Sequence, residues 1–392
     1  MAAPRVLHLI AYFEAGGIEK WLLSMLEQID RSVCEMDFCC KLREGYLAPE
    51  ARRHGAHIFT NLFTPAHLPY GRELARILQE GQYDVVHNHM ETLSGYPVWI
   101  ARRLGIPVIS SFHNTRFPPG EQSRHSRVLT GLRSSYSRLS IGYALQRSDI
   151  VTGCSRAVLR SLAPDYAQRP HFRVLYYGVR VPPEATGEER RAFRAELGWH
   201  ESVPIVLHVG RFVEQKNHAG VLQVFRKARA QVPNAKLVLV GDGPLRATME
   251  AEIQRSGLSE SVRLLGIRND VPHIMCVSDL FLFPSRHEGF GLVATEANAA
   301  GLPVVGSAIS GLDEAVCPGE TALLYPPDDV DRMAGAVVQL LTDPNYARHM
   351  GTLGRKRVEA EFSLAVSARR LLELYHECLG HRQRTNDRYA RR

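Results

Sequence analysis

Residues 6–29 read VLHLIAYFEAGGIEKWLLSMLEQI, a stretch that joins an apolar run, a glycine turn and a helical pattern. The run Val6–Ala11 has the length of a buried strand. After the turn, six apolar residues recur at helical spacing and form one face: Ile18, Trp21, Leu22, Met25, Leu26 and Ile29. Strands that alternate with such helices build buried parallel sheets, so we expect an α/β fold.

The same alternation continues along the chain and pauses once, at the polar, proline-rich residues 181–191, which we predict to be a linker. Before the pause, apolar runs predict further strands at 36–40, 85–87, 108–111, 150–152 and 174–177. After it, they predict strands at 205–209, 237–240, 262–265, 280–283, 303–306 and 322–325. From 329 to about 379 the pattern is helical.

These elements predict two Rossmann-like domains of similar size, at residues 1–180 and 181–361. Residues 362–392 are predicted to form a C-terminal helix and basic tail that packs back toward the first domain. Sheets of this kind bind ligands beyond the carboxyl ends of their strands, so we expect the two domains to face each other across a cleft. The loops that follow strands should therefore carry the chemistry.

Composition excludes several classes of protein. The chain has 392 residues, of which 45% are hydrophobic and 23% charged, so it is neither mainly disordered, collagen-like nor coiled coil. Its seven cysteines form no C-x-x-C pair, and we interpret them as free thiols in a reducing compartment. It shows neither a signal-peptide pattern nor the ~18 apolar residues of a membrane span. We predict a cytoplasmic protein, free or peripheral on the cytosolic face of the membrane.

The first domain offers two candidate loops. Gly16 and Gly17 let the backbone approach a ligand, or they make a tight turn; the chain has neither a G-x-G-x-x-G spacing here nor a G-x-x-x-x-G-K-[ST] loop anywhere. His87 and His89 end one strand and His113 ends another. Two histidines two apart point the same way and would suit a metal, but no carboxylate or cysteine lies near them in sequence. We interpret them, and His113 above all, as hydrogen-bonding groups.

The second domain places two cations after its first strand. Arg211 and Lys216 can face one anion from a loop that enters a helix. A guanidinium grips a diphosphate with two hydrogen bonds, and an ammonium adds a point charge. The later segment Gly241–Pro244, which reads GDGP, is interpreted as a sharp turn rather than a ligand site.

The densest segment is residues 283–305, FPSRHEGFGLVATEANAAGLPVV. If Glu288 and Glu296 shared one helix, eight residues would separate them by ~12 Å. That exceeds the roughly 5–9.5 Å of paired hydrolytic carboxylates, so a glycosidase pair is not expected. The two acids can instead contact two ends of one extended ligand, while the amides of residues 290–292 bind a phosphate. The alternative is a capping glutamate and a solvated one.

In combination these motifs resemble the large retaining glycosyltransferase family four, and within it the branch that assembles bacterial exopolysaccharides. The resemblance spans residues 5 to 379 and rests on the order and spacing of six motifs: Gly16-Gly17 with Glu19, residues 84–89, residues 112–114, residues 209–216, residues 241–244 and residues 288–305. It implies the GT-B fold, a nucleotide-sugar donor, retention of anomeric configuration, and neither cofactor nor metal. The D-x-D at Asp329-Val-Asp331, a metal motif of other glycosyltransferases, is accordingly interpreted as a helix cap.

The resemblance also implies residue roles. Arg211 and Lys216 would hold the donor diphosphate and stabilise the leaving phosphate. Glu288 would contact sugar hydroxyls, Glu296 the ribose hydroxyls, and His113 the sugar near the reacting face. The remaining donor-binding positions are Gly16 and Gly17 as a loop on the phosphates, Gly289, Phe290, Gly291 and Leu292 as phosphate amides, and Gly266, Ile267 and Arg268 at the base. Residues 176–178, Tyr-Tyr-Gly, depart from the family's usual Pro-Asn-Gly, so no hinge role of that asparagine carries over.

The predicted activity is transfer of a sugar from a nucleotide donor, most often UDP-linked in such relatives, to a saccharide or lipid-linked acceptor. Two alternatives stay open. A nucleotide-sugar 2-epimerase of similar shape would convert the donor without an acceptor, and a non-catalytic sugar-nucleotide-binding protein would use the same cleft.

The net charge of +7 has a local origin. Residues 102–173 hold 12 arginines against Glu121, Asp149 and Asp165, a larger excess than that of the whole chain. A basic face on the acceptor side predicts peripheral contact with an anionic membrane or with a pyrophosphate-linked acceptor; a solvated surface is the alternative. Nucleic acid is not an expected partner.

Overall fold

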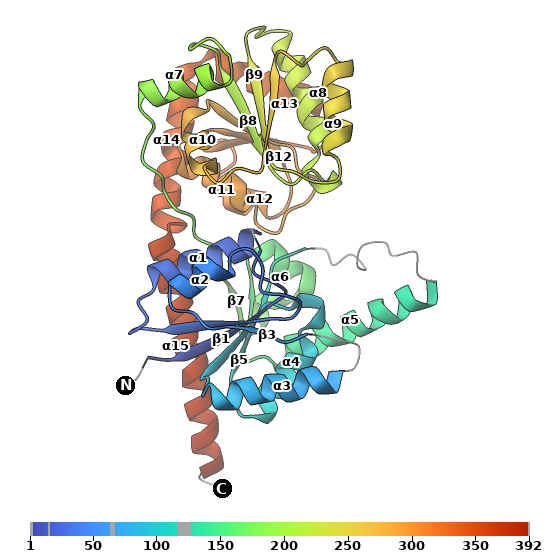
Figure 1. The fold of residues 1–392 in the computed structure, drawn as a ribbon, viewed down its shortest axis with the longest axis vertical. Coiled ribbons are helices and arrows are strands. Elements are labelled where there is room, and N and C mark those ends of the chain that lie inside the picture. Colours follow the sequence, from blue (N-terminus) through green and yellow to red (C-terminus); the bar gives the residue numbers. More distant parts are fainter. Residues whose placement is uncertain (1–2, 15, 63–66, 116–126, 391–392) are drawn as a thin grey trace. The chain divides into compact units, whose positions relative to one another are not determined.

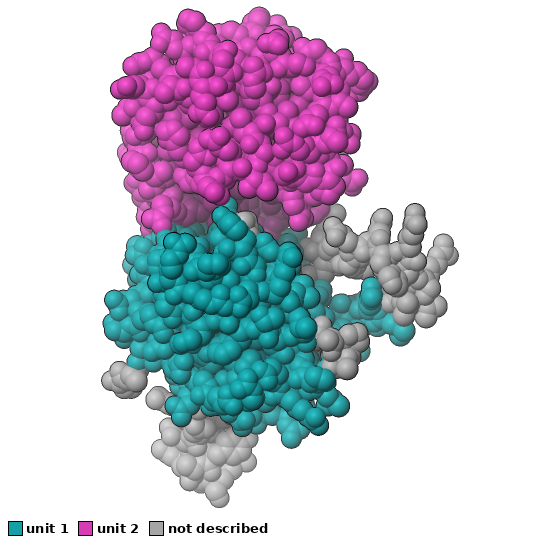
Figure 2. Space-filling model, in the orientation of Figure 1, with its two compact units in different colours: residues 1–178, 364–392 teal, residues 179–363 magenta. Residues whose placement is uncertain are grey.

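The computed structural model describes residues 3–14, 16–62, 67–115 and 127–390. The chain divides into two compact units, shown in Figures 1 and 2. Unit 1 comprises residues 1–178 and 364–392, and unit 2 comprises residues 179–363. The predicted domain limits, 180 and 361, differ from these unit limits by two residues each.

Unit 1 is built on a sheet of seven parallel strands in the order β3-β2-β1-β4-β5-β6-β7. The strands are β1 (Arg5–Ile10), β2 (Glu35–Cys40), β3 (Ile58–Thr60), β4 (Val85–Asn88), β5 (Val108–Phe112), β6 (Ile150–Gly153) and β7 (Phe172–Val174). The helices are α1 (Gly17–Gln28), α2 (Ala48–Arg53), α3 (His67–Glu80), α4 (Gly95–Arg103), α5 (Arg127–Arg147), α6 (Arg156–Leu162) and α15 (Leu364–Ala390). Strand order runs outward from β1 in both directions, as in a Rossmann-like sheet.

Two strands of unit 1 differ from the sequence-based prediction. The sequence pattern does not reveal β3, because an edge strand of three residues carries too little periodicity. It predicts β7 at 174–177, but the ladder to β6 ends at Val174. The apolar run continues beyond it because Leu175 and Tyr177 are buried by side-chain packing rather than by strand pairing.

Unit 2 holds a sheet of six parallel strands in the order β10-β9-β8-β11-β12-β13. The strands are β8 (Ile205–Val209), β9 (Lys236–Val240), β10 (Val262–Gly266), β11 (Leu280–Phe283), β12 (Val304–Ser307) and β13 (Ala322–Tyr325). The helices are α7 (Gly187–Glu196), α8 (His218–Arg229), α9 (Arg246–Arg255), α10 (Val271–Val277), α11 (Leu292–Ala299), α12 (Leu312–Ala315), α13 (Val330–Thr342) and α14 (Pro344–Glu361). The predicted linker 181–191 is wrong from residue 187, because a capping box between Thr186 and Glu189 starts α7 there.

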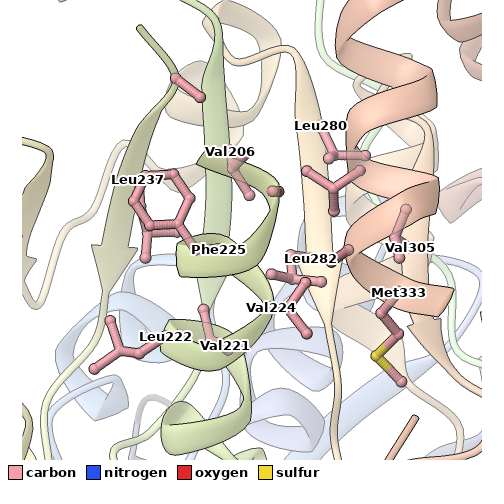
Figure 3. Close-up of a cluster of buried hydrophobic side chains, with 14 of the residues drawn as sticks. Val206, Val221, Leu222, Val224, Phe225, Leu237, Leu280, Leu282, Val305 and Met333 are labelled. Atoms are coloured by element: carbon pink, nitrogen blue, oxygen red, sulfur yellow. The ribbon is translucent and has the colours of Figure 1, made fainter. Parts of the chain in front are cut away.

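Apolar side chains hold the sheet of unit 2 against its helices. Figure 3 shows α8 and α13 packed on one face of this sheet. The cluster joins Val206, Leu237, Leu280, Leu282 and Val305 of the strands to Val221, Leu222, Val224 and Phe225 of α8 and Met333 of α13. Each such side chain stabilises the fold by about 1.5–3 kcal/mol relative to an exposed one. This packing fixes the strand ends from which the loops of the candidate site emerge.

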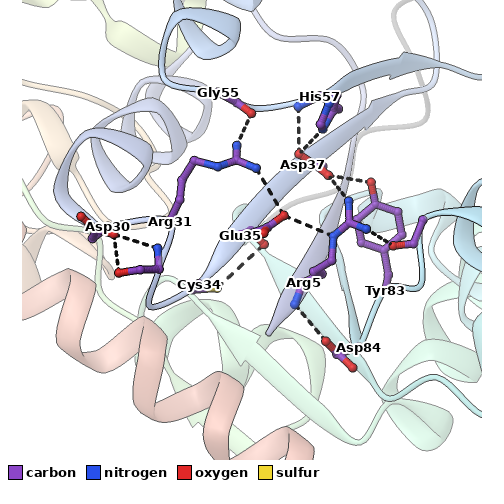
Figure 4. A network of polar contacts seen from close by, with 12 residues as sticks. Arg5, Asp30, Arg31, Cys34, Glu35, Asp37, Gly55, His57, Tyr83 and Asp84 are labelled. Atoms are coloured by element: carbon purple, nitrogen blue, oxygen red, sulfur yellow. Dashed lines mark hydrogen bonds and ion pairs between the residues drawn. The ribbon is translucent and has the colours of Figure 1, made fainter. Parts of the chain in front are cut away.

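Polar contacts hold the amino ends of the strands of unit 1, as Figure 4 shows. The Arg5 guanidinium lies 3.3 Å from a Glu35 carboxylate oxygen and 3.4 Å from Asp37. The Arg5 backbone N–H donates to Asp84, and the Tyr83 hydroxyl donates to Asp37. This network joins β1, β2 and the entry to β4 at the edge of the sheet opposite the candidate functional loops.

Helix α15 belongs to unit 1, although the whole of unit 2 precedes it in sequence. It packs on α1 and β4. The Trp21 indole N–H donates to the Ser367 hydroxyl over 2.9 Å, and Tyr375 is fully buried. The C-terminal helix therefore contributes side chains to the interior of the first unit.

Candidate functional site

The loops that follow β8 and β11 meet in unit 2. The Arg286 backbone N–H donates to the Gln215 carbonyl, and the Gln215 amide donates to the His287 carbonyl, both over 2.9 Å. Asn217 has a left-handed backbone with φ of 53°, caps α8 through Gly220, and donates to the Pro284 carbonyl. These contacts place the predicted cationic loop directly against the predicted acidic loop.

Lys216 and Glu288 form an ion pair at this junction. The Lys216 ammonium lies 2.7 Å from a Glu288 carboxylate oxygen, and it also lies 5.0 Å from the centre of the Phe283 ring. Glu288 is buried, with 8% of its surface exposed. An ammonium has three N–H donors, and this pair uses one of them. The pair thus holds a cation in a fixed position at the carboxyl end of the sheet, where a diphosphate can approach.

Other predicted donor-binding residues of unit 2 lie in the loops after β8 and β11 and in helix α11. Arg211 lies two residues after the end of β8 and is exposed. Glu288 lies in the loop before α11, whereas Glu296 lies within that helix, so the ~12 Å helical separation assumed from the sequence does not apply. Gly291 caps α11 with a left-handed φ of 84°, and Leu292 is its first residue. The Phe290 ring packs on Phe362, so that side chain belongs to the core.

The predicted base-binding segment follows β10. Gly266 has a φ of 67° and its carbonyl accepts the Gly241 N–H. Ile267 is 77% exposed, an apolar side chain at the open edge of the sheet. The Arg268 guanidinium makes two hydrogen bonds to Asp270, of 2.8 and 2.6 Å, and this holds the pKa of that carboxyl below its usual range. Arg268 therefore shapes the loop through Asp270.

Two segments have the structural roles that the sequence predicts, a turn at Gly241–Pro244 and a helix cap at Asp329. Gly241 packs on the backbone of Gly210, and Gly243 on that of Phe212, so the GDGP segment is a structural turn. The Asp329 carboxylate accepts the Arg332 N–H and caps α13, as predicted for the D-x-D segment.

The carboxyl ends of β1, β4 and β5 in unit 1 bring four histidines together. His8 on β1 lies opposite His87 on β4 in the parallel ladder. The ring nitrogen atoms of His8 and His89 lie 3.1 Å apart, and those of His89 and His113 lie 3.3 Å apart. Sequence reasoning missed His8 because it lies inside an apolar run. The sequence pattern points only to His87 and His89 as candidate metal ligands. His8 adds a third ring, and nitrogen atoms of His8, His87 and His89 lie within 4.8 Å of one another.

His113 is tied to its surroundings at three points. Its backbone N–H donates to the Glu91 carboxylate over 2.9 Å. Its ring contacts His89 through Nε2 and the Tyr177 hydroxyl through Nδ1. A sugar hydroxyl would therefore reach a nitrogen of this ring only by taking the place of one of these partners, and Tyr177 is the partner outside the histidine cluster.

The predicted phosphate loop begins α1 in unit 1. Gly16 is the N-cap and Gly17 the first helical residue, and both are exposed; Ala15 lies outside the described residues. A Cβ on Gly16 would lie 2.2 Å from a carboxylate oxygen of Glu19. Burial raises the pKa of Glu19 to about 7. A glycine at position 16 thus leaves room for the Glu19 carboxylate beside the backbone of this loop.

Acid is expected to destabilise unit 1. Burial lowers the pKa of His8 and His113 to about 3, and those of His87 and His89 lie well below the usual value. Below pH ~6.5 the histidines of the unfolded chain bind protons, whereas the buried rings of the folded protein stay neutral, so the free energy of unfolding falls as the pH drops. Glu19 has the opposite effect: because its pKa is raised, the folded protein binds this one proton more readily than the unfolded chain, which raises the free energy of unfolding as the pH drops. Denaturant titrations between pH 7 and 5 measure the net loss; constant stability would contradict the burial of neutral rings.

Comparisons with known proteins identify the class. Residues 15–181 match the model of Glycosyltransferase Family 4, and residues 189–357 match that of Glycosyl transferases group 1. The N-acetyl-α-D-glucosaminyl L-malate synthase of Bacillus anthracis is 26% identical over 327 residues, 81% of each chain. A GDP-mannose-dependent α-(1-6)-phosphatidylinositol monomannoside mannosyltransferase of Mycobacterium tuberculosis is 30% identical over 270 residues, 63% of this chain and 69% of that protein.

The fold agrees with these matches. The Anabaena protein HepE, crystallised with UDP, superposes with a TM-score of 0.81 over 94% of this chain and 98% of its own, at 19% identity. Two Rossmann-like units with sheets of this topology define the GT-B class of glycosyltransferases. The chain belongs to glycosyltransferase family four, whose enzymes build polysaccharides and other glycoconjugates.

Proposed function

We propose that this glycosyltransferase moves a hexose from a UDP-sugar to a saccharide or lipid-linked acceptor, with retention of anomeric configuration and without a metal. The ion pair between Lys216 and Glu288, with Arg211 exposed on the same loop, carries the proposal. A departing nucleoside diphosphate gains negative charge, and cations fixed in advance stabilise that charge as a metal would. GDP is the alternative nucleotide, because one relative is named as GDP-mannose-dependent.

The individual roles are those that the family resemblance implies. Arg211 and Lys216 bind the diphosphate, and the amides of residues 290–292 at the start of α11 add donors to a phosphate. Glu288 orients Lys216 and accepts sugar hydroxyls with its second oxygen, while Glu296 accepts from the ribose. The exposed Ile267 offers an apolar surface to the base. His113 of unit 1 binds the transferred sugar.

Incubation with a panel of nucleotide sugars, with and without saccharide and lipid-linked acceptors, tests the activity. We expect nucleoside diphosphate to be released when an acceptor is present. Conversion of the donor to an epimer without any acceptor would show the 2-epimerase instead. Binding of a nucleotide sugar with no turnover under any condition would show a non-catalytic protein.

We also propose that α5 contacts an anionic membrane or a pyrophosphate-linked acceptor. Among the described residues, every helix is too short or too polar to span a membrane. In the described part of the basic segment, Arg102 forms an ion pair with Asp149, Arg169 with Asp165 and Arg173 with Glu377. Arg116 and Arg124 lie outside the described residues. On α5, by contrast, Leu132 and Leu139 are exposed at 63% and 75%, next to the exposed Arg133 and Arg138.

Replacing Arg133 and Arg138 by alanine is expected to weaken sedimentation with anionic vesicles roughly tenfold or more, because each arginine near such a surface contributes about 1 kcal/mol. The matched control is the double change Arg226→Ala and Arg348→Ala, which removes the same charge from exposed sites on unit 2. Equal sedimentation of the wild type with anionic and neutral vesicles would show that the basic segment is only a solvated surface.

A further inference from the structure

Eight buried or partly buried polar groups of unit 1 form one continuous chain of hydrogen bonds. Its members, in order, are Tyr177, His113, His89, His8, Tyr375, His87, Ser111 and Thr152. The successive distances from the His113–His89 pair to the His87–Ser111 pair are 3.3, 3.1, 3.1, 3.1 and 2.7 Å. The chain thus joins His113 at the carboxyl end of β5 to Tyr375 of the C-terminal helix.

The four rings are coupled through this chain. Burial keeps the pKa of every ring far below its usual value, so each imidazole is neutral, with one N–H donor and one acceptor nitrogen. Each ring uses both nitrogen atoms within the chain. Choosing the donor at one ring therefore sets the donor at the next ring. A hydroxyl oxygen can accept on both sides, so the direction can also change at Tyr375 or Ser111, but only the arrangement that leaves the Tyr177 proton unused protonates His113 at Nδ1.

The two ends favour one direction. If the hydrogen bonds run from Tyr177 toward Thr152, the Tyr177 hydroxyl donates to His113, and the proton of the Thr152 hydroxyl has no acceptor within the chain. In the reverse direction the Tyr177 proton is left over. A threonine hydroxyl rotates to suit its surroundings, whereas a phenol proton stays near the plane of its ring. Leaving the buried Tyr177 donor unused is the costlier outcome, so we expect a preference of roughly tenfold for the first direction.

We propose that this chain fixes His113 as the tautomer protonated at Nε2, with Nδ1 as a hydrogen-bond acceptor, and that Tyr375, His8 and His89 are positioning residues for it. The consequence for sugar transfer rests on the proposed function: an incoming sugar hydroxyl replaces Tyr177 as the donor to Nδ1. The tautomer itself does not depend on the activity.

A metal is the competing use of the same rings. His8, His87 and His89 lie close enough together to share one ion. Such an ion would take one nitrogen from each ring and so break at least two links of the chain. Elemental analysis of the purified protein therefore bears on the proposal: a stoichiometric metal that is lost in the variant His8→Gln would overturn it.

The direct test is NMR of protein labelled with ¹⁵N at the histidine rings, which separates protonated from unprotonated nitrogen atoms. In the wild type we expect His113 to carry its proton on Nε2. The variant Tyr375→Phe leaves the His8 Nε2 proton without its acceptor. The hydrogen bonds from Tyr177 to His8 then have an unused buried donor in either direction, so neither direction is preferred. We expect His113 in this variant to shift to a mixture of both tautomers, although Tyr375 is not its hydrogen-bond partner.

The variant Tyr83→Phe is the matched control, because Tyr83 is a buried tyrosine of the same unit that donates to Asp37 and lies outside the chain. It should leave the tautomer of His113 unchanged. Ser111→Ala, a smaller change at the far end, should also produce the mixture, and it serves if Tyr375→Phe does not fold. A wild-type His113 protonated at Nδ1, or a tautomer unaltered in both chain variants, would overturn the proposal.

The role in transfer has a separate readout. In Tyr375→Phe we expect kcat for sugar transfer to fall about tenfold with little change in the KM for the donor, whereas Tyr83→Phe retains both. If the tautomer of His113 changed but kcat did not, the hydrogen-bond chain would still fix the tautomer, but it would have no role in sugar transfer. Absence of transfer in the wild type would count against the proposed function alone.

Discussion

Replacing Lys216 by alanine is expected to lower the rate of acceptor-dependent sugar transfer by about 10²–10³-fold, the usual effect of removing one preorganised group that stabilises developing negative charge. The ammonium is held 2.7 Å from Glu288 at the carboxyl end of the sheet, so a diphosphate meets a cation that needs no rearrangement. Initial rates of nucleoside diphosphate release at saturating donor measure the effect on kcat.

Lys227 provides the matched control. It is also a lysine of unit 2 paired with an acid, Asp331, but both side chains are largely exposed on the surface. Lys227→Ala should keep the full rate. Because Lys216→Ala leaves Glu288 buried without its partner, thermal unfolding must be measured beside activity, and Lys216→Met, which keeps the apolar stem, separates lost charge from lost packing. Retention of full activity in both Lys216→Ala and Glu288→Ala would show that the donor site is wrongly assigned.

Replacing Gly241 by alanine is expected to destabilise unit 2 by about 2–6 kcal/mol, the sum of two separate costs. Its φ of 131° strains any residue with a Cβ, and the added atom would lie 2.1 Å from the Gly210 carbonyl oxygen. Backbone strain costs about 1–3 kcal/mol, and overpacking costs about 1–3 kcal/mol more. The displaced Gly210 immediately precedes Arg211, so donor binding should weaken as well. Chemical denaturation and donor titration measure the two effects.

Gly257 separates the two causes of this loss. It has a left-handed φ of 65°, but a Cβ added there would meet no atom of the described residues within 4 Å. Gly257→Ala should therefore show only the cost of the backbone conformation, about 1 kcal/mol, and no effect on the donor. Equal losses in both variants would mean that the contact between Gly241 and Gly210 contributes nothing.

Much of the fold is predictable because parallel strands buried on both faces leave uninterrupted apolar runs. Strands such as β8 and β11 are located within a residue for that reason. The failures lie at the edges of the sheet and in polar surface segments. β3 has three residues, β7 is followed by buried residues that do not pair, and the exposed helix α7 shows no apolar stripe in its first turn.

The candidate site is predictable only in part. The glycines and charged residues at strand ends identify the loops, and the resemblance supplies their roles. The contact between Lys216 and Glu288 is not readable from the sequence, because it depends on β8 and β11 being neighbours across 72 residues of chain. His8 lies in an apolar run, and Tyr375 belongs to no motif. Both join the histidine cluster of unit 1 only because β1 pairs with β4 and α15 returns to unit 1.

The most direct test of the central claim follows one reaction in the wild type and in Lys216→Ala. Nucleoside diphosphate release is measured with and without acceptor, and NMR of the product reads the anomeric configuration of the transferred sugar. The account predicts release that requires an acceptor, a product with the configuration of the donor, and a loss of about 10²-fold or more in the variant. Release without an acceptor, an inverted product, or an undiminished rate in Lys216→Ala would contradict it.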